Sequence, residues 1–174
     1  MSIAVCPGSF DPITLGHADV VRRARSMFDE VVVAVAHNSS KQALLSPDER
    51  VALASDALAD LDGVRVVATS GLLAGFVREV GASAVVKGLR SGADLDAEHA
   101  MALMNRHLSG VETVFVLGDP ALAHVASSLV KDVARHGGRI EDLVTPAVAA
   151  AVRRAVGAPV GEPRDGSRGG EDAR

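Results

Sequence analysis

The sequence is poor in aromatic residues, with no Trp, no Tyr and only four Phe among 174 residues. Beyond these few Phe and the His residues, nothing offers a platform for stacking nucleic-acid bases. Basic residues are also in deficit, because 18 Lys and Arg stand against 22 Asp and Glu, a formal net charge of −4. Proteins that bind nucleic acids or membrane surfaces usually have a basic excess. We therefore expect neither nucleic acid nor membrane as a partner.

Other absences narrow the class of protein further. The single cysteine, Cys6, excludes an internal disulfide framework and fits a reducing, cytoplasmic location. The first residues lack the basic and apolar segments of a signal peptide. No apolar run approaches the roughly 20 residues that span a bilayer. Six scattered His and one Cys form no zinc-binding pattern, so we predict no dedicated metal site.

What the sequence does have is a large content of small aliphatic residues, mostly Ala, Val and Leu, arranged in alternating short runs and helix-like segments. The pattern predicts strands at residues 3–6, 31–36, 64–68, 83–86 and 113–117. It predicts helices at residues 16–27, 46–61, 72–80, 94–108, 127–136 and 145–156. The helix at 46–61 begins with Ser46, Pro47 and Glu49, the pattern of a capping box.

Five alternations of strand and helix predict an α/β fold with a five-stranded parallel sheet, doubly wound and Rossmann-like, with a C-terminal helix. Residues 1–156 form the expected domain. Residues 157–174 are rich in Gly, Pro and charge and are predicted to be a disordered tail. Ligands of such sheets bind beyond the carboxyl ends of the strands, so the loops that follow the strands are the place to look for chemistry.

The loop after the first strand reads PGSFDPITLGH at residues 7–17. Gly8 and Ser9 allow backbone N–H groups to approach a phosphate, and Pro12 stiffens the turn. Gly16 and His17 open the next helix, whose N-terminus offers free N–H groups and a positive dipole end. The histidine can donate to phosphate oxygens there. For the Gly16 and His17 pair alone, a glycine-rich turn with a helix-capping histidine is the simpler interpretation, but the whole string after a buried strand favours phosphate binding.

Polar residues also follow the other strands. Lys41 lies just past the second strand, and Lys87 and Arg90 flank Gly88 after the fourth. Ser127 and Ser128 begin a helix, where they can cap it and contact phosphate. Taken singly, each residue also fits an ordinary role as a solvated lysine or an N-cap. Together they predict a phosphate-binding edge of the sheet.

Residues 7–17 resemble the T-x-G-H signature of the nucleotidyltransferase superfamily, the relatives of class I aminoacyl-tRNA synthetase catalytic domains. More narrowly, the chain resembles the phosphopantetheine adenylyltransferases of coenzyme A synthesis over about residues 3–156. The resemblance continues, in order and spacing, through Lys41, Asp48, Glu49, Arg50, Lys87, Gly88, Leu89, Arg90, Asp94, Glu98, Met104, Asn105, Arg106, His107, Ser127, Ser128, Leu129, Val130 and Lys131.

The resemblance implies adenylyl transfer, in which the phosphate of 4′-phosphopantetheine attacks the α-phosphorus of ATP and releases pyrophosphate. It implies His17 and Lys41 as catalytic residues. It implies an ATP site made of Ser9, Phe10, His17, Gly88, Leu89, Arg90, Glu98, Leu122, Ala123, His124, Val125, Ala126, Ser127 and Ser128. It implies a phosphopantetheine site made of Ser9, Lys41, Leu73 and Lys87. Mg²⁺ would accompany ATP, held largely by phosphates and water. The resemblance also implies a homohexamer and feedback inhibition by coenzyme A.

The chain departs from the family pattern in two places. Ala97 stands where the family has Tyr, and residues 122–128 lack the family's aromatic residues and one serine. In the family these positions line the adenine side and the subunit contacts, and lost aromatic packing weakens purine binding by on the order of 1 kcal/mol. Two alternatives therefore stand beside adenylyl transfer. One is a nucleotidyltransferase for another phosphorylated metabolite, and the other is a non-catalytic paralogue that binds coenzyme A or nucleotide.

Overall fold

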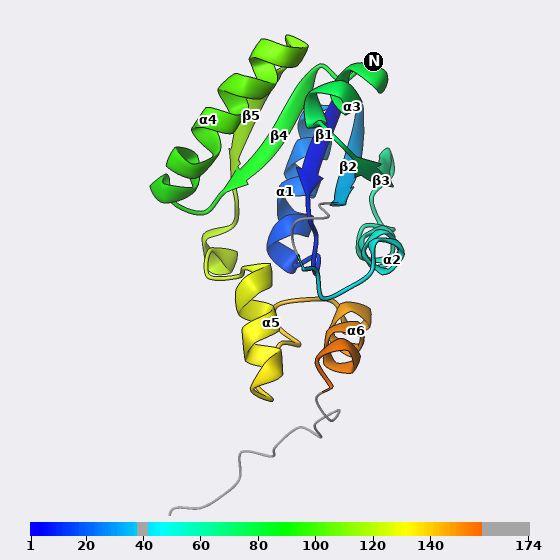
Figure 1. The fold of residues 1–174 in the computed structure, drawn as a ribbon, viewed down its shortest axis with the longest axis vertical. Helices are drawn as coiled ribbons and strands as arrows, with labels where there is room; N and C mark the ends of the chain where they lie inside the picture. Colours follow the sequence, from blue (N-terminus) through cyan, green and yellow to red (C-terminus); the bar gives the residue numbers. More distant parts are fainter. Residues whose placement is uncertain (38–41, 158–174) are drawn as a thin grey trace, which may run out of the picture.

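A computed structural model describes residues 1–37 and 42–157 of the chain. Its centre is one sheet of five strands in the order β3-β2-β1-β4-β5, with every neighbouring pair parallel (Figure 1). The strands are β1 (Ile3–Gly8), β2 (Glu30–His37), β3 (Val64–Ser70), β4 (Ala84–Leu89) and β5 (Glu112–Leu117). This topology confirms the predicted α/β fold. The order reverses direction between β1 and β4, which creates a crevice at the carboxyl ends of these strands.

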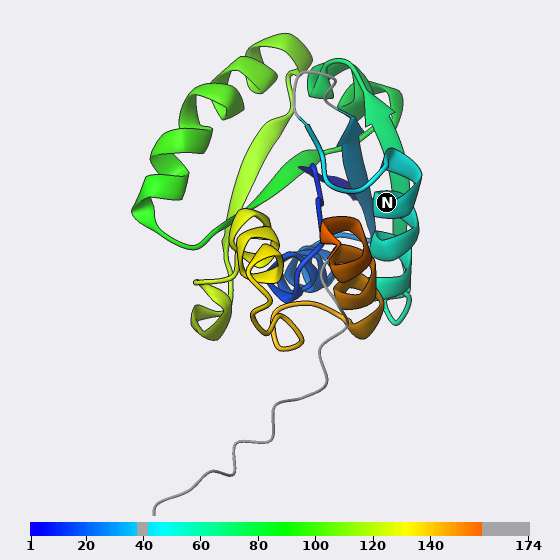
Figure 2. The same ribbon diagram turned by 60° about the horizontal axis from the view of Figure 1, so that its bottom comes forward.

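Helices cover both faces of the sheet and also its carboxyl end. They are α1 (Leu15–Met27), α2 (Pro47–Ala57), α3 (Leu73–Glu79), α4 (Gly92–Ser109), α5 (Ser127–Arg135) and α6 (Pro146–Val156), with a 3₁₀ turn η1 (Pro120–Leu122). In Figure 1, α5 and α6 lie below the sheet, beyond the end to which the arrow of β1 points. Figure 2 brings this end forward and shows α5 and α6 side by side in front of the sheet. The two helices therefore flank the region where ligands of such sheets bind.

The two faces of β2 explain its uninterrupted apolar sequence. Val31, Val33 and Val35 are buried in the larger core cluster, which also holds the apolar faces of α1, α2, α5 and α6. Val32 and Ala34 point to the opposite face and pack in a second cluster with α3. A strand buried on both sides has no polar face, so it reads as a continuous apolar run. None of the helices in the described ranges is long and apolar enough to cross a membrane.

The helix starts follow from local sequence in most places. Ser46 caps α2 as predicted, since its hydroxyl accepts from the Glu49 N–H while Glu49 accepts from the Ser46 N–H. The predicted end of this helix at residue 61 is too late, because α2 ends at Ala57. The prediction that Ser127 and Ser128 cap α5 is also wrong. Ala126 is the N-cap residue and has no side-chain oxygen, so the cap makes no side-chain hydrogen bond.

Candidate active site

A cavity of about 670 Å³ opens at the carboxyl ends of β1 and β4. Its size falls within the roughly 300–1,000 Å³ typical of small-molecule sites. Residues of the β1–α1 loop, the β4–α4 loop and the start of α5 line it together. The predicted site residues on its wall are Ser9, Phe10, His17, Lys87, Gly88, Leu89, Arg90, Glu98, Leu122, Val125, Ala126, Ser127 and Ser128. Segments more than 100 residues apart in the chain thus meet at one cleft.

A smaller cavity of about 320 Å³ adjoins the first. Four residues line both, namely Ser9, Phe10, His17 and Ser127. The smaller cavity is otherwise lined by Asp11, Ala36, Gln42, Ala43, Arg50 and Lys131. The side chain of His17 therefore stands where the two cavities meet. We refer below to the larger and the smaller cavity.

The ring of His17 has a fixed orientation at the start of α1. The backbone N–H of Thr14 donates to its Nδ1 over 3.1 Å, and the Thr14 hydroxyl accepts from the His17 N–H, which completes a capping box. Since a backbone N–H can only donate, Nδ1 is the unprotonated nitrogen of the ring. The proton of the neutral ring is consequently on Nε2. The simple capping role considered for His17 is real, and it fixes the tautomer.

The surroundings of His17 also keep its ring uncharged. Burial, and after it the positive charge of Arg90, lower the pKa of His17 from the usual 6.5 to about 4. The Phe10 ring packs edge-on against it, with ring centroids 5.2 Å apart and an interplanar angle of 75°. Phe10 has a positive φ of 46°, and a Cβ on Gly8 would lie 3.0 Å from its ring. Gly8 therefore makes room for the ring that supports His17.

Two ion pairs hold the charged residues of the larger cavity. Lys87 Nζ lies 3.1 Å from Glu98 Oε2, so a predicted phosphopantetheine residue is paired with a predicted ATP residue. The guanidinium of Arg90 donates to both carboxylate oxygens of Asp94 over 3.2 Å, and this lowers the pKa of Asp94. Its remaining donor Nη1 lies 3.4 Å from the Val125 carbonyl oxygen. Asp94 thus orients Arg90 across the cleft.

The backbone of β4 lies unusually close to α1 at Gly88. A Cβ added there would lie only 2.5 Å from Cγ2 of Val20, well inside normal contact. Only glycine therefore allows the strand and the helix to approach this closely. The close approach brings the β4–α4 loop, with its cations, next to the β1–α1 loop.

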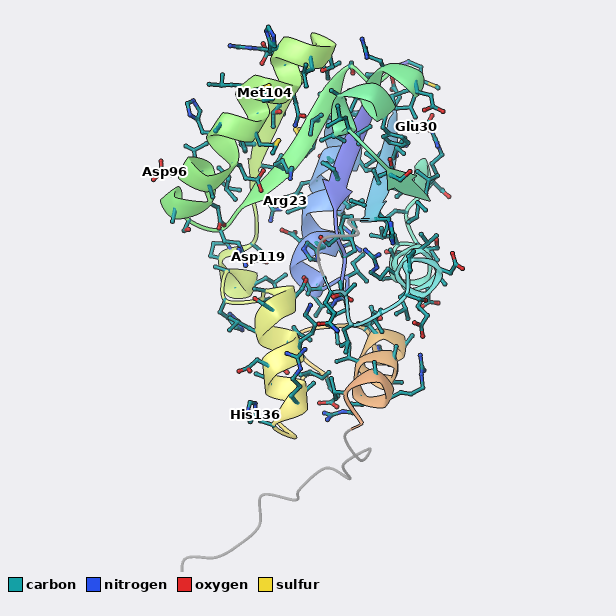
Figure 3. All side chains as sticks on the ribbon, viewed as in Figure 1. Arg23, Glu30, Asp96, Met104, Asp119 and His136 are labelled. Atoms are coloured by element: carbon teal, nitrogen blue, oxygen red, sulfur yellow. The ribbon has the colours of Figure 1, made fainter. Side chains whose placement is uncertain are left out.

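A further hydrogen-bonded link holds the loop after β5. Asp19 on α1 accepts from the Asp119 N–H over 2.8 Å and from Nε of Arg23, also over 2.8 Å. Figure 3 labels both residues and shows Asp119 just above α5. The link fixes the turn that leads to Leu122, on the wall of the larger cavity.

Some predicted site residues lie elsewhere. Ala123 and His124 are exposed and line neither cavity. Leu73 begins α3 and packs against the second core cluster, so it too lies off both walls. Lys41 lies outside the described residues. The roles of these four residues stay predictions.

Two cations for which the sequence predicts no role line the smaller cavity. Arg50 on α2 is only 3% exposed, and its Nη1 donates to the carbonyl oxygens of Ser9 and Ala36 over 2.8 and 2.9 Å. Lys131 lies one helical turn after Ser127 on α5, and this i, i+4 spacing is the signal that could have placed it beside the site. For Arg50 no local signal exists, because burial of an arginine under a loop 41 residues away is a tertiary property.

Asp11 joins three parts of the chain at the smaller cavity. Its carboxylate accepts from Lys131 Nζ over 2.7 Å and from the N–H groups of Leu44 and Leu45, both over 2.9 Å. Burial alone would raise the pKa of Asp11, but these hydrogen bonds outweigh it and lower the pKa. Ser127 adds a fourth link, since its hydroxyl donates to the Pro12 carbonyl over 2.9 Å. These contacts fix α5 against the β1–α1 loop.

Comparison with known proteins places this fold and site in context. Residues 5–133 match the Cytidylyltransferase-like family. A phosphopantetheine adenylyltransferase of Nocardioides sp. is 52% identical over 148 residues, covering 85% of this chain and 93% of that protein. One of Bifidobacterium animalis subsp. lactis is 49% identical over 158 residues, covering 90% and 99%. A solved structure described as a nicotinate-nucleotide adenylyltransferase of Vibrio parahaemolyticus has a TM-score of 0.67 over 90% of this chain and 95% of that one, at 19% identity, and shows the shared fold.

The parallel sheet has a capping histidine at the point where the strand order reverses, and together with the family match this identifies the chain as a nucleotidyltransferase. Within that class the curated relatives, about half identical over most of their length, narrow the assignment. The chain belongs to the phosphopantetheine adenylyltransferase family.

Proposed function

We propose that this chain transfers the adenylyl group of ATP to 4′-phosphopantetheine, giving dephospho-coenzyme A and pyrophosphate. In this reaction an oxygen of the acceptor phosphate forms a bond to the α-phosphorus, and the bond from that phosphorus to the β-phosphate oxygen breaks with its electron pair. The observation that supports it best is the neutral, Nε2-protonated His17 at the junction of two cavities. The names of the close relatives supply the acceptor.

Such a reaction needs no nucleophile from the protein, because the attacking phosphate is already an anion. Cys6 lines the larger cavity, but burial raises the pKa of its thiol to about 12, so it stays protonated near neutral pH. What the protein must supply is position and charge neutralisation for two anionic substrates. A fixed Nε2–H donor stabilises negative charge on the reacting phosphate by a hydrogen bond, without a cost of reorientation during the reaction, while the cations of the cleft neutralise charge.

The cations of the larger cavity are already paired with carboxylates, and substrate phosphates can take the place of these partners. We infer that the phosphates of ATP contact Arg90 while Asp94 holds its guanidinium, and that Lys87 contacts phosphopantetheine. The pairing of Lys87 with Glu98 supports a shared cleft, because it joins the two predicted substrate sites directly. Ser127 and Ser128 add N–H groups at the N-terminus of α5, where an anion is stabilised.

Mg²⁺ is proposed to enter with ATP. The described residues contain no group of three or more potential metal ligands. Of the carboxylates on the wall of the larger cavity, Asp94 and Glu98 are paired with cations. This donor set fits a magnesium ion bound mainly by phosphate oxygens and water. The ion would neutralise phosphate charge, and the protein would orient its complex with ATP.

The assembly, regulation and location of the enzyme are also proposed from its family. We infer a homohexamer in the cytoplasm, inhibited by coenzyme A at the same cleft. Exposed apolar side chains that share one face of α4 support assembly, namely Met101, Met104 and Leu108. An apolar helix face of this kind is typical of protein contacts. Light scattering should give six times the chain mass, and a monomer at working concentration would contradict the proposal.

Product identification tests the proposed acceptor and nucleotide. The enzyme is incubated with Mg²⁺ and either ATP or CTP, and with either 4′-phosphopantetheine or unphosphorylated pantetheine. Mass spectrometry should detect dephospho-coenzyme A only from ATP with 4′-phosphopantetheine. Transfer to another phosphorylated metabolite would favour a related nucleotidyltransferase, whereas tight calorimetric binding of coenzyme A without any product would favour a non-catalytic paralogue.

A further inference from the structure

The guanidinium of Arg50 is buried, and one of its edges lacks a hydrogen-bond partner among the described residues. Its Nη1 is satisfied by the carbonyl oxygens of Ser9 and Ala36, but buried Nε has no hydrogen-bond partner in the part of the chain that the structure describes. Nε and the second terminal nitrogen form a fork of two parallel N–H groups, which fits two oxygens of a carboxylate or phosphate. Arg50 therefore presents an unused oxyanion fork.

Other arginines of this chain show what such a fork normally does. Arg153 is 8% exposed, about as buried as Arg50, and both Nε and Nη2 of its fork donate to Glu141. Arg90 uses the same fork on both oxygens of Asp94. An arginine charge that is buried without an anionic partner is unfavourable. The fork of Arg50 is thus complementary to an oxyanion that the described chain does not provide.

The smaller cavity supplies the space and a second cation for that oxyanion. Arg50 and Lys131 both line it, and the ammonium of Lys131 has three N–H groups, of which Asp11 takes one. Asp11 lines the cavity as well, but its carboxylate already accepts from Lys131 and from two backbone N–H groups. Among the described lining residues, two cations therefore accompany one carboxylate, which already holds Lys131 in place.

We propose that the smaller cavity is an oxyanion site that receives the pyrophosphate leaving group, with the Arg50 fork and the Lys131 ammonium as its binding groups. This assignment rests on the proposed adenylyl transfer. The in-line geometry of phosphoryl transfer puts the attacking and the leaving oxygen on opposite sides of the phosphorus. Of the described residues predicted for phosphopantetheine, Lys87 lines only the larger cavity, whereas Ser9 lines both.

The position of Ser127 gives the leaving group a path into the smaller cavity. Ser127 begins α5, where we place the terminal phosphates of ATP, and it lines both cavities. Lys131 lies one turn further along the same helix. A pyrophosphate released at Ser127 would therefore exchange contacts along α5 and reach the fork of Arg50.

Two substitutions and one control test this site in the full-length protein. Lys131→Gln removes the ammonium at a side chain that is 19% exposed, and Arg50→Lys keeps a charge but removes the fork. Arg153→Lys removes the fork of another buried arginine, which lines neither cavity, and is the matched control. Pyrophosphate itself is titrated into the resting protein by calorimetry. The Michaelis constants for pyrophosphate in the reverse reaction and for 4′-phosphopantetheine in the forward reaction are then measured.

Both site variants should weaken pyrophosphate binding about tenfold or more, because each loses a charge-assisted contact. The KM for 4′-phosphopantetheine and the affinity of Arg153→Lys should stay near wild type. Unchanged pyrophosphate affinity in Lys131→Gln would overturn the proposal even if Arg50→Lys failed to fold. If only the KM for 4′-phosphopantetheine rose, the smaller cavity would bind the phosphate of the acceptor instead of pyrophosphate, and the proposal would be overturned. Absence of turnover in the wild type would refute adenylyl transfer instead, and the pyrophosphate titration would still decide whether the cavity binds an oxyanion.

Discussion

At the scale of single residues, His17 combines a structural and a chemical task. Its Nδ1 accepts the Thr14 N–H at the start of α1, and this leaves Nε2 as the donor beside both cavities. Helix capping and the proposed phosphate binding thus fall to opposite edges of one ring. A substitution of His17 can therefore distinguish the two tasks. Loss of the cap should lower the free energy of unfolding only slightly, whereas loss of a donor to the transition state should lower the turnover rate strongly.

Replacing His17 with Ala should lower kcat by about 100-fold or more, because one preorganised donor to the reacting phosphate is lost. The free energy of unfolding should fall by only about 1 kcal/mol, the usual value of a cap. Turnover and urea denaturation measure the two effects. His136→Ala is the control, because His136 is exposed at the far end of α5 (Figure 3). Wild-type turnover in His17→Ala would remove this side chain from the mechanism.

The low pKa of His17 predicts a pH dependence of stability. The folded ring takes up a proton only near pH 4, whereas an ordinary histidine of the unfolded chain does so near 6.5. Its contribution to stability is therefore complete above pH 6.5 and is lost as the pH falls towards 4. Between pH 7 and 5, wild type should lose on the order of 1 kcal/mol more than His17→Ala. Parallel losses, or an NMR titration of His17 near 6.5, would refute the prediction.

At the scale of elements, the contact between β4 and α1 decides how the cleft is assembled. Gly88 has no Cβ, so β4 lies against Val20 of α1 without a clash. The loops that follow β1 and β4 start from these two elements and carry the residues of the larger cavity. The width of the cleft therefore depends on a packing contact that binds no ligand.

Gly88→Ala should destabilise the protein by about 1–3 kcal/mol, because its new Cβ overlaps Val20. Val20→Ala creates room for that Cβ, although alone it costs on the order of 1 kcal/mol in lost burial. The double variant should thus be more stable than the sum of the single effects predicts, by about 0.5 kcal/mol or more. Chemical denaturation of the four proteins measures this. Additive effects would show that the two residues are not in contact.

The helices and strands also show which structural features can be predicted from the sequence and which cannot. The doubly buried apolar run of β2 and the capping box of Ser46 are local patterns, and both were predicted. Ser127 was expected to cap its own helix, but its hydroxyl donates to Pro12, 115 residues away. Arg50 beneath the Ser9 carbonyl is another long-range contact. Residue types at strand ends thus predict which loops line the larger cavity, whereas the partners of individual side chains depend on packing between distant segments.

At the scale of the whole molecule, the buried core is built from elements between Ile3 and Val156. A chain that ends at Gly157 should keep its melting temperature within about 2 °C, since the sequence predicts no packed residues beyond that point. Its kcat should also be unchanged. Differential scanning calorimetry and turnover of the shortened and full chains test the domain boundary. A marked loss of stability would mean that the predicted tail belongs to the folded domain.

The central claim is that this nucleotidyltransferase uses 4′-phosphopantetheine as its acceptor. The most direct test is a coupled assay of pyrophosphate release from Mg²⁺ and ATP, with and without 4′-phosphopantetheine. The account predicts release that requires the acceptor, is proportional to enzyme and is accompanied by an equal amount of dephospho-coenzyme A. Folded protein that releases no pyrophosphate in response to 4′-phosphopantetheine would contradict it.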